Sequence, residues 1–227
     1  MDIDGNLVKI RETIESTALS TGRDPKNIEL LAVSKTVSPD IIREVYRKGQ
    51  RSFGENRVQE WREKVDLLPD DCKWHLIGRL QTNKVKYLDA RVLLIHSLDR
   101  YELLQKLEEQ GKRIDHVFTT LIQINVADDE NKAGLKPEEL KDFLGEVGVH
   151  PHVRVNGLMT IGKLHADREE TRGYFRQLRE LRDQYRGLNF PGVMLEHLSM
   201  GMSNDFDLAI EEGATIVRIG RQIFGER

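Results

Sequence analysis

Short apolar runs recur along the chain at a spacing that predicts eight buried strands. The runs are rich in β-branched and other apolar residues, and they are nearly continuous rather than alternating with polar residues. This character is typical of strands in a parallel sheet that is buried on both faces. The expected strands cover residues 28–35, 51–56, 73–78, 92–98, 117–126, 153–161, 193–201 and 215–220.

Helical patterns fill the segments between these strands. Four candidates begin at Pro or Asp and end at Gly, as helix boundaries commonly do, and they cover residues 39–49, 99–111, 137–148 and 167–187. A further helix is expected over 5–21, before the first strand. The alternation predicts a single (β/α)8 barrel domain over residues 1–227. The alternative is an open doubly wound sheet, but no G-x-G-x-x-G follows the first strand.

Composition and charge exclude several classes of protein. A formal net charge of −3 disfavours a general nucleic-acid role, because binding to a phosphate backbone needs concentrated positive charge. The N-terminus has no apolar signal core, and no window approaches the roughly 18 apolar residues of a membrane span. The single cysteine, Cys72, cannot form an intramolecular disulfide. We therefore expect a cytoplasmic protein that binds neither nucleic acid nor membranes.

Lys35 stands at the end of the first expected strand, where "ELLAVSK" changes from apolar to polar. The chemistry of a (β/α)8 barrel lies at the C-terminal ends of its strands. A lysine at such a strand end commonly extends into solvent. If Lys35 is instead partly desolvated inside the barrel mouth, its neutral amine is favoured and can form a Schiff base with a carbonyl compound.

Arg218 interrupts the apolar run "TIVRIG" of the last expected strand. A buried guanidinium needs hydrogen-bond acceptors. A structural ion pair with a barrel carboxylate, Glu55 or Glu196, would meet this need. A ligand bound in the barrel mouth is the alternative.

Residues after the last two strands form a candidate anion site. Gly220 leads into a short helix, and we expect the amides of Gly220 and Arg221 to face an anion, near the phosphate site that recurs in these barrels. Ser199 and Ser203 offer hydroxyl donors to the same anion, although Ser203 suits a helix N-cap equally well.

These features together fit a ligand with a phosphate at one end, an aldehyde at the other and a ring atom for Arg218 between them. Pyridoxal 5′-phosphate has this layout. A Schiff-base aldolase and a sugar-phosphate enzyme also place a lysine near a phosphate site, and they remain alternatives on the residues alone.

Two neighbouring residues, Trp74 and His75 in "KWHLIG", are better explained by structure than by catalysis. We expect Trp74 to be packed in the core and His75 to be hydrogen-bonded. The sequence indicates no metal site.

Five motifs resemble the YggS/PROSC family, the pyridoxal phosphate homeostasis proteins. They are "AVSK", "FGENRVQE", "WHLIGRLQTNK", "GLMTIG" and "LSMGMSNDFDLAIEEGATIVRIGRQIFG". These motifs are long, and they stand in the order of the family from about residue 28 to residue 225. The resemblance implies a barrel of the alanine racemase N-terminal domain type that binds pyridoxal 5′-phosphate without an established turnover reaction.

The resemblance also assigns roles to individual residues. Lys35 would hold the cofactor as an aldimine, and Arg218 would face its pyridine nitrogen. The implied cofactor-binding residues are Lys35, Asn56, Ser199, Ser203, Arg218, Gly220 and Arg221. Relatives often have a small hydroxyl residue at the position of Arg221, so only the backbone amide contact carries over there, unless the guanidinium turns inward.

Two functions remain: a carrier or regulator of the cofactor, and an amino-acid racemase or decarboxylase. An arginine cannot give up its proton, so it leaves the pyridine nitrogen unprotonated and weakens the ring as an electron sink. A racemase also needs acid–base groups on both faces of the cofactor. In alanine racemase-like enzymes the second group comes from a further domain, which we do not expect after the eighth strand. We therefore expect a monomeric carrier or regulator whose partners are apo forms of pyridoxal phosphate-dependent enzymes.

Overall fold

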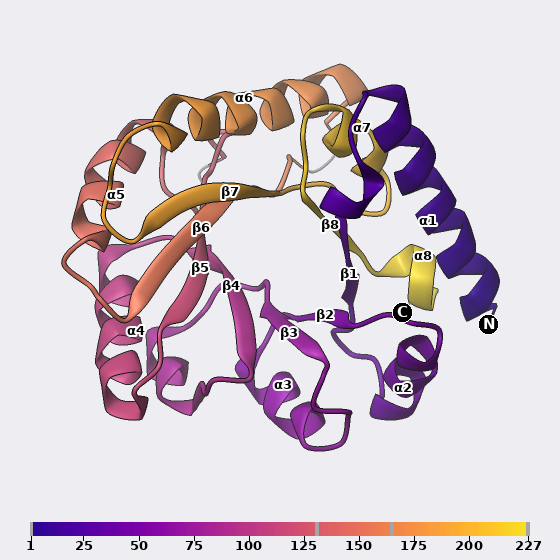
Figure 1. Cartoon of the computed structure of the whole chain (residues 1–227), viewed down its shortest axis with the longest axis horizontal. Helices are drawn as coiled ribbons and strands as arrows, with labels where there is room; N and C mark the ends of the chain where they lie inside the picture. Colours follow the sequence, from indigo (N-terminus) through magenta and orange to yellow (C-terminus); the bar gives the residue numbers. More distant parts are fainter. Residues whose placement is uncertain (1, 130–131, 164–165, 226–227) are drawn as a thin grey trace.

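The strands of the computed structural model, which describes residues 2–129, 132–163 and 166–225, close into a barrel (Figure 1). Neighbouring strands are parallel and follow in sequence order, and the last strand pairs with the first. The strands are β1 (Glu29–Val33), β2 (Ser52–Glu55), β3 (Lys73–Leu76), β4 (Val92–Leu98), β5 (Phe118–Gln123), β6 (Val153–Met159), β7 (Val193–Ser199) and β8 (Ile216–Ile219). The predicted (β/α)8 barrel is confirmed.

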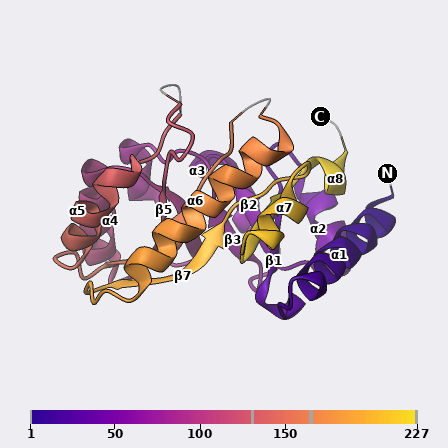
Figure 2. The same ribbon diagram turned by 90° about the horizontal axis from the view of Figure 1, so that it is seen from above.

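Helices surround the barrel and cover the outer face of its strands (Figure 1 and Figure 2). They are α1 (Ile3–Ser20), α2 (Pro39–Arg47), α3 (Val58–Val65), α4 (Tyr101–Ile114), α5 (Leu140–Val147), α6 (Arg168–Arg186), α7 (Phe206–Glu211) and α8 (Arg221–Phe224). A 3-10 helix, Thr82–Tyr87, stands in place of an α-helix between β3 and β4. Over the described ranges, no helix combines the length and apolar character needed to cross a membrane.

The predicted N-terminal helix is present as α1, which packs against α7 and α8 (Figure 1). Asp2 caps it by accepting a hydrogen bond from the amide of Gly5 at 2.9 Å. Asn6 Nδ2 donates to the carbonyl of Ile223 in α8 at 3.3 Å. Its buried side chains recur every three or four residues and form the apolar stripe of an amphipathic helix. They are Ile3, Leu7, Ile10, Ile14 and Ala18.

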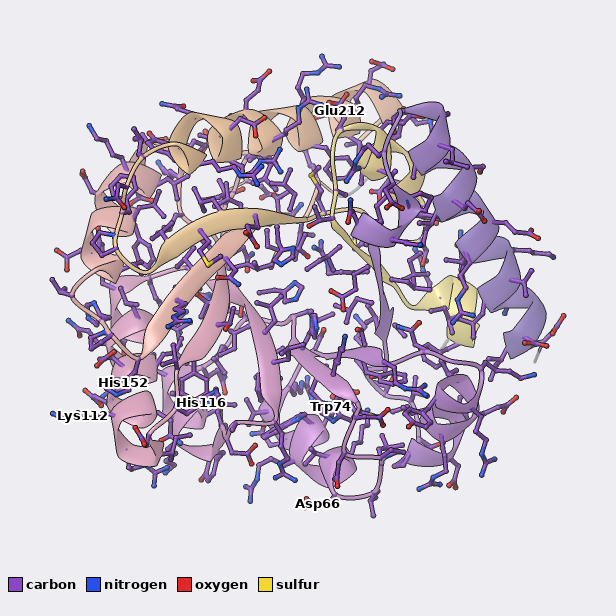
Figure 3. All side chains as sticks on the ribbon, viewed as in Figure 1. Asp66, Trp74, Lys112, His116, His152 and Glu212 are labelled. Atoms are coloured by element: carbon purple, nitrogen blue, oxygen red, sulfur yellow. The ribbon has the colours of Figure 1, made fainter. Side chains whose placement is uncertain are left out.

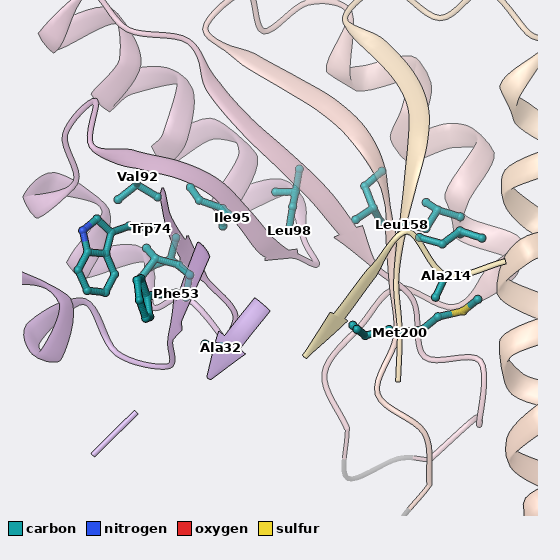
Figure 4. Packing of buried hydrophobic residues seen from close by; sticks show 14 of the residues in the cluster. Ala32, Phe53, Trp74, Val92, Ile95, Leu98, Leu158, Met200 and Ala214 are labelled. Atoms are coloured by element: carbon teal, nitrogen blue, oxygen red, sulfur yellow. The ribbon is translucent and has the colours of Figure 1, made fainter. Parts of the chain in front are cut away.

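The alternation of side chains along each strand sorts the core into two layers. Outward side chains fill the space between barrel and helices, where Figure 4 shows Phe53, Trp74 and Val92 close together. The rings of Phe53 and Trp74 lie 5.8 Å apart, which confirms the packed position expected for Trp74. Inside the barrel, the inward apolar side chains form a separate, smaller cluster. They are Leu31, Leu94, Leu121, Met159 and Ile216.

Among the element boundaries that differ from the sequence-based prediction, two bear on the site and on the packing. β1 ends at Val33, whose pairing with Gly54 is the last between β1 and β2, and Lys35 and Thr36 form a turn instead of continuing the strand. α4 runs through Gly111 to Ile114. Gly111 does not stop the helix but permits close packing, because a Cβ at this position would lie 2.6 Å from the Cβ of His152.

Candidate functional site

Arg218 lies on β8 and points into the barrel, two residues after the inward-facing Ile216. It is 5% exposed, and its guanidinium donates to Ser199 Oγ at 2.6 Å and to the Thr160 carbonyl at 2.7 Å. Burial lowers the pKa of Arg218 to about 10, while Asp205 opposes this shift. The guanidinium is therefore held by neutral acceptors at the barrel mouth.

The alternative explanation of Arg218 as a structural ion pair is not supported. Glu55 pairs with Lys64, at 2.9 Å between Nζ and Oε1. Glu196 is exposed to solvent. No carboxylate of the described residues forms an ion pair with Arg218.

Buried histidines continue the polar interior from Ser199. His96 Nδ1 lies 2.9 Å from Ser199 Oγ, and His96 Nε2 lies 2.9 Å from His75 Nδ1. The hydrogen-bonded role expected for His75 is confirmed. Sequence reasoning missed His96. A signal was available, because His96 interrupts the apolar run "VLLIHSL" in the same way that Arg218 interrupts "TIVRIG". The Thr160 contact uses a backbone carbonyl and leaves no signal in the sequence.

Lys35 stands on a turn at the mouth, two residues beyond the end of β1. Residues 29, 31 and 33 share one side of the strand, so position 35 continues the inward-facing set. The structure leaves Lys35 exposed, which is the first of the two alternatives that the sequence left open, and a lysine desolvated inside the barrel mouth is not observed. The reason is the early end of β1, after which Thr36 turns the chain with a φ of 60°.

Helix α3, which the sequence analysis did not identify, holds this turn from outside the barrel. Glu60 Oε2 accepts the Thr36 amide at 2.9 Å. Lys64 Nζ donates to the Ser34 carbonyl and to Glu55 Oε1, both at 2.9 Å, and the Ser34 hydroxyl also donates to Glu55, at 2.6 Å. Burial raises the pKa of Glu55, and Lys64 opposes that shift. A possible signal was Lys64, which lies on the buried face of α3.

Asn56 directly follows β2, two positions beyond Gly54, just as Lys35 lies two positions beyond Val33, the residue that pairs with Gly54. It is half-buried and lines a polar cleft at the ends of β2 and β3. The other residues around this cleft include Arg57, Glu60, Leu80, Gln81 and Lys84, but neither Lys35 nor Arg218.

Ser203 lies in the loop after β7, and Gly220 and Arg221 follow directly after β8. Gln222 Nε2 donates to the Ser203 carbonyl at 2.6 Å. Gly220 occupies the N-cap of α8, and the first amides of a helix have no partner within it. Ser203 is buried and does not cap α7, because Asp205 holds that position. The side chain of Arg221 is exposed.

The closed barrel with a polar mouth defines the class of protein. Residues 7–227 match the family model described as alanine racemase, N-terminal domain. The chain is 50% identical over 223 residues to the pyridoxal phosphate homeostasis protein of Aquifex aeolicus, with 97% of this chain and 96% of that protein covered.

Solved structures of similar proteins have the same fold. An unknown protein from Bifidobacterium adolescentis superimposes with a TM-score of 0.93 at 31% identity, covering 98% of this chain and 94% of that one. PipY of Synechococcus elongatus with PLP bound has a TM-score of 0.81 at 36% identity, with 94% and 100% covered. The chain therefore belongs to the alanine racemase N-terminal domain family and, within it, to the pyridoxal phosphate homeostasis proteins. The resemblance carried by the five motifs is confirmed.

Proposed function

We propose that this protein binds pyridoxal 5′-phosphate and acts in its cytoplasmic homeostasis as a carrier or regulator. The observation that carries the proposal is Arg218, a buried guanidinium at the barrel mouth. Its bonds to Ser199 and Thr160 leave further N–H groups for a ligand. The PipY structure with PLP bound and the name of the Aquifex aeolicus relative support the same ligand.

The residues of the mouth fit the chemical groups of this cofactor. When bound, the cofactor supplies an aldehyde that reacts with primary amines and a pyridine ring that can accept electrons. Lys35 offers the primary amine, and Arg218 offers a donor to the pyridine nitrogen. Ser203 and the backbone amides of Gly220 and Arg221 offer donors to the phosphate.

Asn56 and Ser199 complete the proposed site. Asn56 directly follows β2, the strand that pairs with β1, and offers an amide beside the ring. The hydroxyl of Ser199 is bonded to Arg218 and His96, so it serves the site through Arg218.

Two properties of the site favour carrying the cofactor over turning over an amino acid. Arg218 keeps its protons, so it can donate to the pyridine nitrogen without protonating it, and an unprotonated ring is a weaker electron sink. Lys35 is exposed, so water or a second amine can reach its Nζ, which suits release of the cofactor to an apo-enzyme. This arrangement leaves at most a weak side activity.

Borohydride reduction of the protein mixed with pyridoxal 5′-phosphate tests the binding. We expect peptide mass mapping to find a single pyridoxyl group, on Lys35. Lys35→Ala should lose both the label and the yellow colour. Lys112→Ala is the matched control, because Lys112 lies on the outer surface of α4 (Figure 3). A label on another lysine, or none in the wild type, would contradict the proposal.

Incubation of the loaded protein with L-amino acids in deuterated water separates a carrier from an enzyme. A carrier should transfer its cofactor to an apo-enzyme and leave the enantiomers unconverted. Chiral chromatography with mass spectrometry would detect conversion. Multiple-turnover formation of the D-isomer that is lost in Lys35→Ala would favour the racemase.

A further inference from the structure

A chain of hydrogen-bonded side chains runs through the barrel below Arg218, and ligand binding at the mouth does not by itself explain it. It passes from Arg218 in β8 to Ser199 in β7, His96 in β4 and His75 in β3. His96 and His75 are 0% and 1% exposed. At the far end, His75 Nε2 lies 3.8 Å from Oε1 of Glu29, the first residue of β1. The hydrogen-bonded chain ends at His75, because Nε2 of this residue is buried and has no hydrogen-bond partner among the described residues.

The contacts point to one direction for every proton in this chain. Arginine has no acceptor, so Ser199 Oγ accepts from Arg218, and its own proton goes to His96 Nδ1. His96 then carries its proton on Nε2 and donates to His75 Nδ1. His75 must in turn carry its proton on Nε2, and this N–H faces the Glu29 carboxylate.

The opposite direction is unfavourable at both ends. If His96 donated to Ser199, the Ser199 proton would need an acceptor other than His96, and Arg218 offers none. At the other end, His75 would turn the lone pair of Nε2 towards the Glu29 carboxylate, so that two acceptors faced each other. Reversal therefore requires a new acceptor for the Ser199 proton, and it also brings the His75 lone pair towards the negative charge of Glu29.

The surroundings hold both imidazoles neutral. Burial is the main cause, and it lowers the pKa of His75 from 6.5 to about 4 and that of His96 well below 6.5. The other titratable groups that act on the two rings are Glu29, Lys73, His197 and Arg218. Only the attraction of Glu29 for His75 favours a charged imidazole. A neutral ring has one donor and one acceptor, as the direction of the chain requires.

We propose that Ser199, His96 and His75 are positioning residues for Arg218, an inference that rests on pyridoxal 5′-phosphate binding at that residue. Ser199 holds Nη1 and the Thr160 carbonyl holds Nη2, which fixes the guanidinium plane and directs its remaining N–H groups to the ring nitrogen. In this hydrogen-bonded chain the Ser199 hydroxyl donates its proton to His96. Ser199 therefore acts on the ring end of the cofactor and does not donate to the phosphate.

Long-range 15N–1H NMR of the ligand-free, histidine-labelled protein tests the direction of the chain without any cofactor. His75→Gln and His96→Gln variants assign the two resonances. At neutral pH we expect both rings to be neutral Nε2–H tautomers, and to remain so after saturation with inorganic phosphate. An Nδ1–H tautomer at His96, before or after phosphate is added, would overturn the proposal, because the Ser199 proton would then go elsewhere.

Titration with pyridoxal 5′-phosphate tests the positioning role. His96→Leu removes the acceptor for Ser199, so we expect affinity to fall about tenfold, the effect of one charge-assisted hydrogen bond, and the absorption maximum of the bound cofactor to shift. His96→Gln can accept from Ser199 and donate to His75, so it should restore both. His152→Gln is the control, because His152 lies at the periphery beside Glu108 (Figure 3).

The outcomes separate this inference from the proposed function. If the wild type bound no pyridoxal 5′-phosphate, the proposed function would fail and the assignment of Arg218 to a ring nitrogen would fail with it. If the wild type bound the cofactor and His96→Leu bound it equally well with the same absorption, the positioning role alone would be overturned.

Discussion

The interior chain at Arg218 and the turn that carries Lys35 lie at the same barrel mouth but are built in opposite ways. Arg218, Ser199 and His96 are buried, and the bonds between them are 2.6 and 2.9 Å long. Lys35 is exposed, and its neighbour Thr36 has a φ of 60°, in the left-handed region that a β-branched residue rarely adopts. One region is a fixed array of donors, and the other is a surface turn.

The turn is held by contacts that lie outside the barrel. Glu60 and Lys64 of α3 bind the backbone on either side of Lys35, and Lys64 is itself paired with the buried Glu55. The donor to the cofactor ring thus lies in the barrel interior. The position of the Lys35 amine, which would bond to the cofactor, instead depends on the Lys64–Glu55 ion pair outside the barrel. This separation suits a carrier, because the amine can be released without disturbing the ring contacts.

Breaking the Lys64–Glu55 ion pair next to the Lys35 turn should have the largest effect on stability. Lys64→Met leaves the fully buried Glu55 without its cation, and we expect the free energy of unfolding to fall by about 4 kcal/mol in urea titrations. The double variant Lys64→Met/Glu55→Gln removes the charge as well and should recover most of the loss. A loss below about 1 kcal/mol in the single variant would mean that Glu55 takes up a proton in place of its partner.

Acidification should have the next largest effect on stability, and it acts on the interior chain through His75. The unfolded chain protonates His75 near pH 6.5, whereas the folded protein does so only near pH 4. The stability from the neutral ring is therefore complete above pH 6.5 and is lost as the pH falls towards 4, by about 3 kcal/mol. Urea unfolding at several pH values should show a shallower slope for His75→Gln and the wild-type slope for Lys35→Ala. Parallel wild-type and His75→Gln curves would contradict the prediction.

Arg218→Lys tests whether the interior array depends on the shape of the guanidinium. A lysine keeps the charge but cannot hold Ser199 and the Thr160 carbonyl in one plane. We expect affinity for pyridoxal 5′-phosphate to fall by about 2 kcal/mol, or roughly thirtyfold, in fluorescence titrations. Arg221→Lys is the matched control, because its exposed side chain changes while the backbone amide remains. Unchanged affinity in Arg218→Lys would show that charge, not planar geometry, matters, and equal losses in the two variants would show that the effect is not specific to position 218.

Thr36→Gly should produce the smallest change, and in the stabilising direction. Glycine adopts the φ of Thr36 without steric cost, but it also increases the entropy of the unfolded chain. We expect a net gain of about 0.5 kcal/mol in the free energy of unfolding. A loss of stability would instead assign the main role at this position to the bond from Thr36 Oγ1 to the Lys35 carbonyl, at 2.6 Å.

Most of the barrel could be predicted from the sequence because its signals are local. A run such as "VLLIHSL" must be buried wherever the chain places it, and a Pro or Asp that starts a helix acts within a single turn. Lys35 and Arg218 were found for the same reason, since a charge within an apolar run stands out without knowledge of its neighbours. The early end of β1 was not predictable, because it depends on where pairing with β2 stops.

Only the tertiary structure decided which groups those charges meet. Ser199 and His96 are 103 residues apart in sequence, and Ser34 and Lys64 are 30 apart. Such contacts depend on the closure and register of the barrel, which set the facing side chains of non-adjacent strands. The sequence by itself determined that a guanidinium and an amine lie near one barrel mouth. Folding determined that the guanidinium is fixed by a buried chain and the amine is left exposed, because hydrogen-bond partners and solvent access are properties of the assembled barrel.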